Sequence, residues 1–181
     1  MVLPRATDAG FTWEDLQALP DDGNRYELME GVLSVVPPPD GRHQLCAYQL
    51  TRLLFDARPP ELVVRIAPFD YTPEPGTSLE PDVLVARRED MQNDRLRATP
   101  QLVVEVASPR TRRHDRGDKL LAYQEFGVPY YWLVDPAVPS LTALHLVDGQ
   151  YVEVATATGE TPYTTDKPFP VTVIPARLLD E

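Results

Sequence analysis

The segment LVVEVA, residues 102–107, constrains the fold more than any other part of the chain. Side chains alternate across a β-strand, so the even-numbered residues of this segment share one face and the odd-numbered residues share the other. Both faces are apolar except at Glu105, a pattern typical of a central strand that is covered on both sides. A carboxylate in such a strand is costly unless it is ion-paired, bound to a metal or placed at a cleft. The segment therefore predicts a layered fold with a charged side chain in its interior.

Hydrophobic periodicity and turn residues place the other elements around this strand. Helices are expected at residues 12–19, 40–54 and 115–126. Strands are expected at residues 25–28, 32–36, 62–71, 82–86, 130–134, 141–147, 151–155 and 171–174. The strand–helix–strand unit from residue 102 to residue 134 predicts a right-handed parallel crossover. We therefore expect a single α/β (mixed α+β) domain over residues 1–181, with a mixed β-sheet flanked by helices and extra β-hairpins.

The charge balance limits the partners of the protein. The chain has 17 basic and 28 acidic side chains, and the net charge of −11 repels phosphate backbones on average. This excludes a general nucleic-acid coat protein and leaves only binding at a local basic patch. No apolar run approaches the roughly 18 residues of a membrane span, and the N-terminus shows no secretory signal. Together with the single cysteine, Cys46, these features predict a cytoplasmic protein without membrane contact.

A second carboxylate, Asp82, stands at the start of an apolar strand. Taken alone, the Pro81-Asp82 pair is typical of a turn. Beside Glu105 on a neighbouring strand it gains another meaning, because two close carboxylates are best tolerated when they share a hard cation. Mg²⁺ is commonly held by one or two carboxylates, with waters and substrate phosphate completing its shell.

Basic residues gather directly after the buried carboxylate. The densest basic stretch of the chain consists of Arg110, Arg112, Arg113, His114, Arg116 and Lys119. Positions 111, 115, 119 and 123 are four apart and would line one face of the expected helix. An exposed Asp115–Lys119 pair, or a solvated charged face, would explain these residues without a function. Phosphodiester cleavage requires a metal pocket rimmed by cations, which makes the arginines candidate phosphate-binding residues.

These residues belong to an ordered set that resembles a known family. The set comprises Arg25-Tyr26-Glu27-Leu28, Pro81-Asp82, Val103-Val104-Glu105-Val106-Ala107-Ser108-Pro109, Thr111, Asp115-Arg116, Lys119, Tyr123, Gly127-Val128 and Tyr131-Trp132. It resembles the Uma-type endonuclease family, a bacterial group of the PD-(D/E)XK, or restriction-endonuclease-like, superfamily. The resemblance covers roughly residues 11 to 135. No single motif in the set is specific, so the resemblance depends on the motifs occurring together and in this order.

The resemblance implies a restriction-endonuclease-like core and a divalent metal, Mg²⁺ or Mn²⁺, bound by Asp82 and Glu105. In the superfamily pattern a lysine follows two residues after the second carboxylate, but this chain has Ala107 there. Family members without that lysine are thought to use a lysine from the next helix instead, and Lys119 is the matching position here. The resemblance also implies that Glu27, an acidic residue nearer the N-terminus, joins the site. Further candidates are Glu30, His43, Asp115 and Tyr123.

The function that follows is hydrolysis of phosphodiester bonds in nucleic acid, with DNA favoured, by a metal-dependent endonuclease. The resemblance also implies a homodimer. One alternative is a catalytically silent nuclease-fold binding or accessory module, which the net charge and the missing third-position lysine favour. Another is a purely structural domain in which arginines pair with Asp82 and Glu105.

Overall fold

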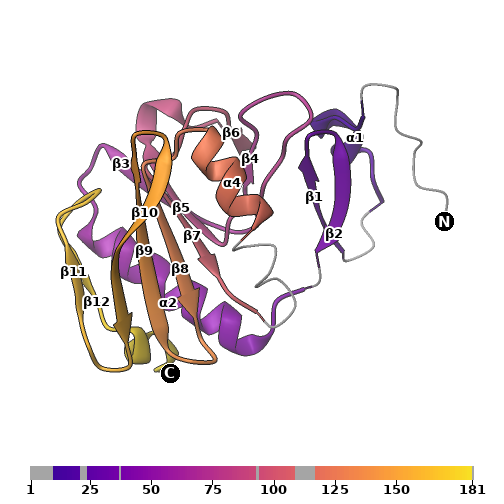
Figure 1. Cartoon of the computed structure of the whole chain (residues 1–181). Helices are drawn as coiled ribbons and strands as arrows, with labels where there is room; N and C mark the ends of the chain where they lie inside the picture. The colour runs from indigo at the N-terminus through magenta and orange to yellow at the C-terminus, as the bar shows by residue number, and fades with distance from the viewer. Residues whose placement is uncertain (1–9, 21–23, 37, 93, 109–116, 181) are drawn as a thin grey trace.

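A six-stranded mixed sheet forms the centre of the computed structural model, which describes residues 10–20, 24–36, 38–92, 94–108 and 117–180 (Figure 1). The strand order is β10-β9-β8-β7-β5-β3. The strands are β3 (Leu62–Ile66), β5 (Val83–Arg87), β7 (Leu102–Val106), β8 (Tyr130–Asp135), β9 (Ser140–Val147) and β10 (Gln150–Thr158). β7 and β8 are parallel neighbours, and the other neighbouring pairs of this sheet are antiparallel. The predicted mixed sheet and the parallel pair around the crossover are therefore confirmed.

Shorter elements surround this sheet in the described part of the chain. Small two-stranded sheets join β1 (Arg25–Met29) with β2 (Val32–Val36), β4 (Asp70–Tyr71) with β6 (Arg95–Leu96), and β11 (Tyr163–Thr165) with β12 (Val171–Val173). The helices are α1 (Trp13–Gln17), α2 (Gly41–Ala57) and α4 (Asp118–Glu125), with 3-10 turns η1 (Arg88–Asp90) and η2 (Pro175–Leu179). The expected extra hairpins are thus present as β1–β2 and β9–β10.

Two apolar clusters cover the two faces of the large sheet. Leu50 of α2 belongs to the same cluster as Val104 of β7. Val103, the next residue along β7, belongs to the other cluster together with Tyr123 of α4. The two helices therefore lie on opposite faces of the sheet, as Figure 1 also shows. The alternation in β7 puts Glu105 on the face that α4 covers.

Local sequence signals explain where the helices begin and end. Thr12 and Asp15 form a capping box at the start of α1, in which each side chain accepts from the other residue's backbone N–H. The side chain of Asp40 accepts a hydrogen bond of 2.9 Å from the backbone N–H of His43 at the start of α2. Gly127 follows α4 with a φ of +72°, a backbone conformation that favours glycine after a helix.

The structure corrects two details of the predicted elements and leaves a third untested. The strand expected over residues 62–71 is broken after Ile66, because Pro68 lacks the N–H that would continue the ladder. The short strand β11 was not expected at all. The helix expected from residue 115 is described from Asp118 onward, and its predicted start lies outside the described residues. In the described part of the chain, no helix has the length and apolar character needed to cross a bilayer.

Candidate active site

Glu105 is the buried centre of the site. It lies in β7, in the middle of the sheet, and only 1% of its surface is exposed. Lys119 Nζ lies 3.1 Å from Glu105 Oε1, and the Tyr123 hydroxyl donates a hydrogen bond of 2.9 Å to the same oxygen. Because Lys119 and Tyr123 are four residues apart, α4 presents both side chains on one face. The helix therefore supplies both polar groups that make burial of this carboxylate tolerable.

Glu27 enters the site from the β1–β2 hairpin. Lys119 Nζ lies 2.7 Å from Glu27 Oε1, so one buried ammonium is shared by two carboxylates. Reciprocal backbone hydrogen bonds of 2.8 Å between Leu28 and Ser78 tie the hairpin to the segment that leads into β5. The backbone N–H of Glu80 in that segment donates to Glu27 Oε1 at 3.3 Å. The hairpin is thus held where it can bring Glu27 to α4.

Asp82 comes directly before β5 and is 3% exposed. In the antiparallel pairing of β5 with β7, Val83 lies opposite Val104. Continuing this register by one residue places Asp82 opposite Glu105. The sheet therefore carries the two carboxylates at matching positions of neighbouring strands.

The contacts of Asp82 favour its charged form. Its Oδ2 accepts a hydrogen bond of 2.7 Å from the backbone N–H of Val106 and lies 3.0 Å from His43 Nε2. Burial alone would raise the pKa of Asp82. The hydrogen bond and charge of His43, the charge of Lys119 and the Val106 N–H outweigh burial and lower that pKa below its usual value. Asp82 is thus held as a carboxylate deep in the protein.

Arg25 connects three of the carboxylates. Its Nε lies 3.3 Å from Glu80 Oε1, Nη1 lies 3.7 Å from Asp82 Oδ1, and Nη2 lies 3.6 Å from Glu27 Oε1. Burial raises the pKa of Glu80 to about 7, although the charge of Arg25 opposes this rise. Burial would lower the pKa of Arg25, but the carboxylates around it raise that pKa above its usual value.

The side chains of the site fit a divalent metal ion in chemistry and charge. The buried carboxylates of the site are Glu27, Glu80, Asp82 and Glu105. Among the described residues they face the side chains of Arg25, Lys119 and His43. Carboxylate oxygens are the ligands that Mg²⁺ and Mn²⁺ prefer. No group of three or more His, Cys, Asp or Glu in the described chain is arranged as a metal cage, but Mg²⁺ needs only one or two carboxylates. Asp82 and Glu105 are the residues that would hold the ion.

The structure brings together six of the seven predicted site residues that it describes. These residues are Glu27, His43, Asp82, Glu105, Lys119 and Tyr123. Ion pairs and hydrogen bonds link them, and Arg25 joins Asp82 to Glu27. Glu30 instead lies in the turn of the β1–β2 hairpin and lines a separate groove beside α4. Asp115 and the predicted phosphate-binding residues Arg110, Arg112, Arg113 and Arg116 lie outside the described residues.

Two residues of the site were not predicted, Arg25 and Glu80. Arg25 stands two residues before Glu27, and Glu80 stands two residues before Asp82. Side chains two apart in extended chain point the same way. That spacing was the available signal for both residues.

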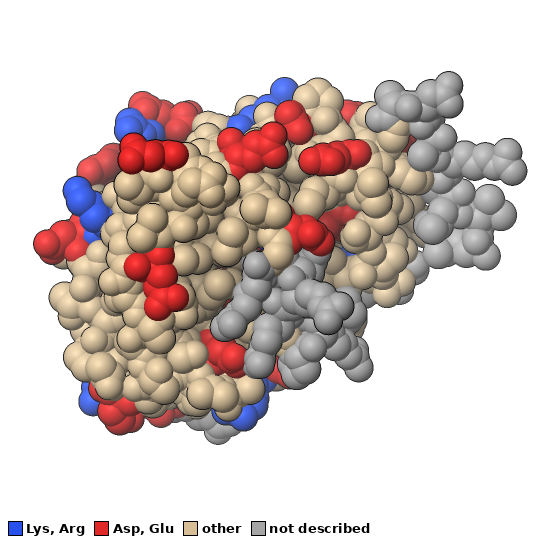
Figure 2. Space-filling model, in the orientation of Figure 1, with Lys and Arg blue, Asp and Glu red and all other residues tan. Residues whose placement is uncertain are grey.

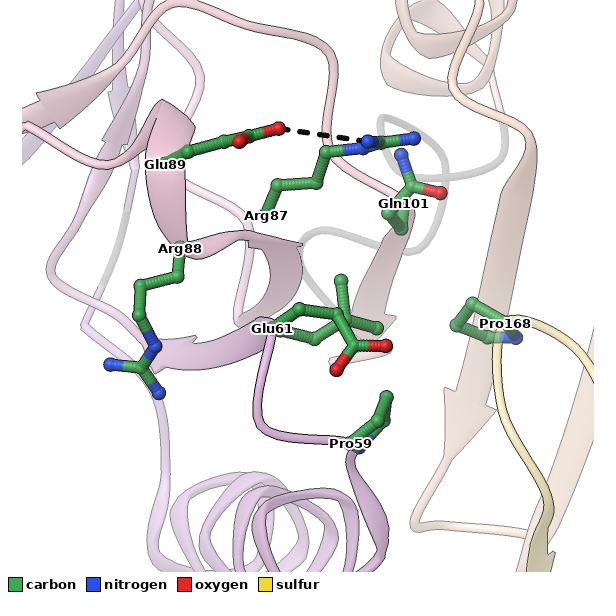
Figure 3. Close-up of a pocket in the computed structure, with 8 residues that line it drawn as sticks. Pro59, Glu61, Arg87, Arg88, Glu89, Gln101 and Pro168 are labelled. Atoms are coloured by element: carbon green, nitrogen blue, oxygen red, sulfur yellow. Dashed lines mark ion pairs between the residues drawn. The ribbon is translucent and has the colours of Figure 1, made fainter.

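A separate hollow of about 730 Å³ lies at the far end of β5 (Figure 3). Its lining includes Arg87, the last residue of the strand, and Glu89, which pairs with Arg87 at 3.6 Å. Both side chains are exposed to solvent. The hollow shares no lining residue with the carboxylate site.

Comparison with known proteins gives a family and a fold. The model of the Uma2 family, described as "Putative restriction endonuclease", matches residues 13–176. A crystal structure described as "a putative nuclease belonging to DUF820" from Anabaena variabilis ATCC 29413 superposes with a TM-score of 0.74. That chain is 15% identical, and the match covers 93% of this chain and 97% of the other, so it shows a shared fold. No curated protein matches the chain.

Proposed function

We propose, from the premise that this chain belongs to the Uma2 family, that its buried carboxylate site hydrolyses phosphodiester bonds of nucleic acid with a divalent metal ion. The observation that carries the proposal is the contact of Lys119 with Glu105, at 3.1 Å. The strand position where the superfamily pattern has its lysine holds Ala107, which is small and buried. Lys119 on α4 therefore contacts the Glu105 carboxylate in place of a lysine at position 107.

Five side chains of the site have a role in the proposed reaction. Bound by Asp82 and Glu105, Mg²⁺ or Mn²⁺ would supply Lewis-acid activation of water and phosphate. The ammonium of Lys119 is placed to orient the attacking water and to offset negative charge that develops on the phosphate. Tyr123 keeps the Glu105 carboxylate in one orientation through its hydrogen bond. Glu27 holds Lys119 from the opposite side and would act on the metal through water.

The substrate is proposed to be DNA, held by a local basic rim. Figure 2 shows more acidic than basic side chains on the face drawn, in line with the net charge of −11. Such a surface repels nucleic acid except where arginines gather. Arg110, Arg112, Arg113 and Arg116 lie in sequence between Glu105 and Lys119, and we propose that they bind the phosphates. The homodimer and the cytoplasmic location stay predictions from the sequence.

A silent binding module is the second candidate. The observation in its favour is that the described carboxylates already have cationic or hydrogen-bonding partners within the protein. A site satisfied in this way could be kept for stability and shape alone. This candidate expects nucleic-acid binding without cleavage.

Cleavage of supercoiled plasmid DNA separates the two candidates. The wild type should nick DNA with Mg²⁺ or Mn²⁺ and not in EDTA, and Glu105→Gln and Lys119→Ala should each lower the rate by about 10²-fold or more. The matched control is Glu89→Gln, which removes an exposed carboxylate at the far end of β5 and should cleave like the wild type. Metal-dependent nicking that survives in Glu105→Gln at the wild-type rate would refute the proposal. DNA binding without nicking by the wild type would favour the silent module.

A further inference from the structure

Arg25 occupies the position of a central counterion. Each of its three guanidinium nitrogens faces a different carboxylate, those of Glu27, Glu80 and Asp82. The three acids come from the hairpin and from the segment before β5, so the guanidinium draws together parts of the chain that are far apart in sequence. One guanidinium thus serves three buried carboxyl groups.

Arg25 has longer contacts with the site and a more exposed side chain than Lys119. The Nη contacts of Arg25, at 3.6 and 3.7 Å, are longer than hydrogen bonds, and its Nε has no hydrogen-bond partner among the described residues. Lys119 has contacts of 2.7 and 3.1 Å. The Arg25 side chain is 18% exposed, whereas that of Lys119 is 2% exposed. Arg25 is therefore nearer to solvent and held by longer contacts than Lys119.

We propose that Arg25 is the built-in counterion of the metal-free site and that it competes with the divalent metal ion for the carboxylates. The inference rests on the proposed function, because it assigns the metal to the same carboxylates. When the metal is bound, its positive charge and that of Arg25 repel each other. The guanidinium then leaves Asp82 and becomes more accessible to solvent.

The competition follows from charge. Without Arg25, Lys119 would be the one lysine or arginine among the described residues that pairs with any of the four carboxylates of the site. Such an excess of negative charge destabilises the metal-free fold and favours any added cation. A purely structural Arg25 would act differently, because its loss would disorder the carboxylates and weaken metal binding. The sign of the change in metal affinity therefore decides between the two roles.

The first experiment is a calorimetric titration of Mn²⁺ into the full chain as wild type, Arg25→Gln and Arg25→Lys. Arg25→Gln should bind Mn²⁺ about tenfold more tightly, as expected for removal of one nearby, partly screened positive charge. Its metal-free form should melt at a lower temperature than the wild type. Arg25→Lys keeps the charge and should bind Mn²⁺ within about threefold of the wild type. Equal or weaker Mn²⁺ binding by Arg25→Gln would overturn the inference.

A second experiment needs no variant. Phenylglyoxal modifies accessible arginines, and peptide mass spectrometry measures the rate at each one. Labelling of Arg25 in the wild type should rise several-fold when Mg²⁺ is added, while labelling of Arg177, which is exposed and remote from the site, should stay constant. Unchanged or slower labelling of Arg25 would contradict displacement by the metal.

The outcomes also separate this inference from the proposed function. If the wild type binds Mn²⁺ and cleaves DNA, but Arg25→Gln binds the ion no more tightly, the inference fails and the nuclease proposal stands. If neither protein binds Mn²⁺, both fail. Tighter binding by Arg25→Gln, with faster labelling of Arg25 in the wild type, supports the competition.

Discussion

The two ends of β5 carry the same kinds of charged groups in opposite surroundings. Before the strand begins, Asp82 is 3% exposed and has polar partners at 2.7 and 3.0 Å. At the other end of the strand, Arg87 and Glu89 form a pair at 3.6 Å with side chains that are 60% and 76% exposed (Figure 3). One strand therefore joins a buried ionic network to an ordinary surface ion pair.

The difference teaches where the charges of this protein affect its free energy of unfolding. An exposed pair gains little, because water screens it and two long side chains lose freedom. A buried network has a large desolvation cost, and losing one member leaves the others uncompensated. Hydrophobic side chains of similar volume could replace such a network at a lower desolvation cost. This fold nevertheless keeps the network at one end of its central sheet. This contrast supports a function at the buried end.

The largest expected effect comes from removing the shared cation of the buried end. Lys119→Met keeps much of the side-chain volume but leaves Glu27 and Glu105 without their ammonium. We expect the free energy of unfolding in EDTA to fall by about 3–5 kcal/mol, the usual cost of an uncompensated buried charge. Urea denaturation followed by circular dichroism measures this change.

The double variant Lys119→Met/Glu105→Gln is the control for that prediction. It removes one of the orphaned negative charges and should recover part of the lost free energy of unfolding. If the single variant lost less than about 1 kcal/mol in its free energy of unfolding, the buried ion pairs would stabilise the fold no more than an exposed pair does. That result would contradict the prediction.

A smaller effect is expected from pH, through Glu80. Burial raises the pKa of this carboxyl from 4.5 to about 7. Between these values the folded protein holds a proton that the unfolded chain has released, so Glu80 lowers the free energy of unfolding as pH rises. Glu80→Gln removes this titration and should flatten the fall between about pH 5 and about pH 7.

Urea denaturation at both pH values in EDTA measures the effect, because a bound metal would change the charge around Glu80. The wild type should lose more free energy of unfolding between the two values than Glu80→Gln does. Identical changes in the two proteins would mean that Glu80 is solvated like a surface carboxyl. Glu80 would then not belong to the buried ionic network.

The core of the buried end was readable from local sequence. Glu105 stood out because its neighbours are apolar on both strand faces, and the structure places it in the central strand with 1% exposure. The spacing of Lys119 and Tyr123 predicted that they share a helix face, and both contact Glu105. Periodicity is a property of consecutive residues, so the sequence carries it directly.

What escaped prediction depends on contacts between distant segments. Arg25 meets Asp82 across 57 positions of the chain, and the Glu80 backbone meets Glu27 across 53. No local pattern predicts that the β1–β2 hairpin packs against the segment that leads into β5. The broken strand at residues 62–71 is a different case, since Pro68 was visible in the sequence and its missing N–H already argued against a continuous ladder.

The smallest effect should come from the exposed end of β5. Glu89→Gln removes the carboxylate that pairs with Arg87 at 3.6 Å. Because both side chains are largely in water, the free energy of unfolding should change by no more than about 0.5 kcal/mol, and added salt should erase the difference. Urea denaturation at low and high salt measures both. If Glu89→Gln lost as much free energy of unfolding as Lys119→Met, the exposed pair would support the structure around the hollow beside it. Burial would then not explain the difference between the two ends of the strand.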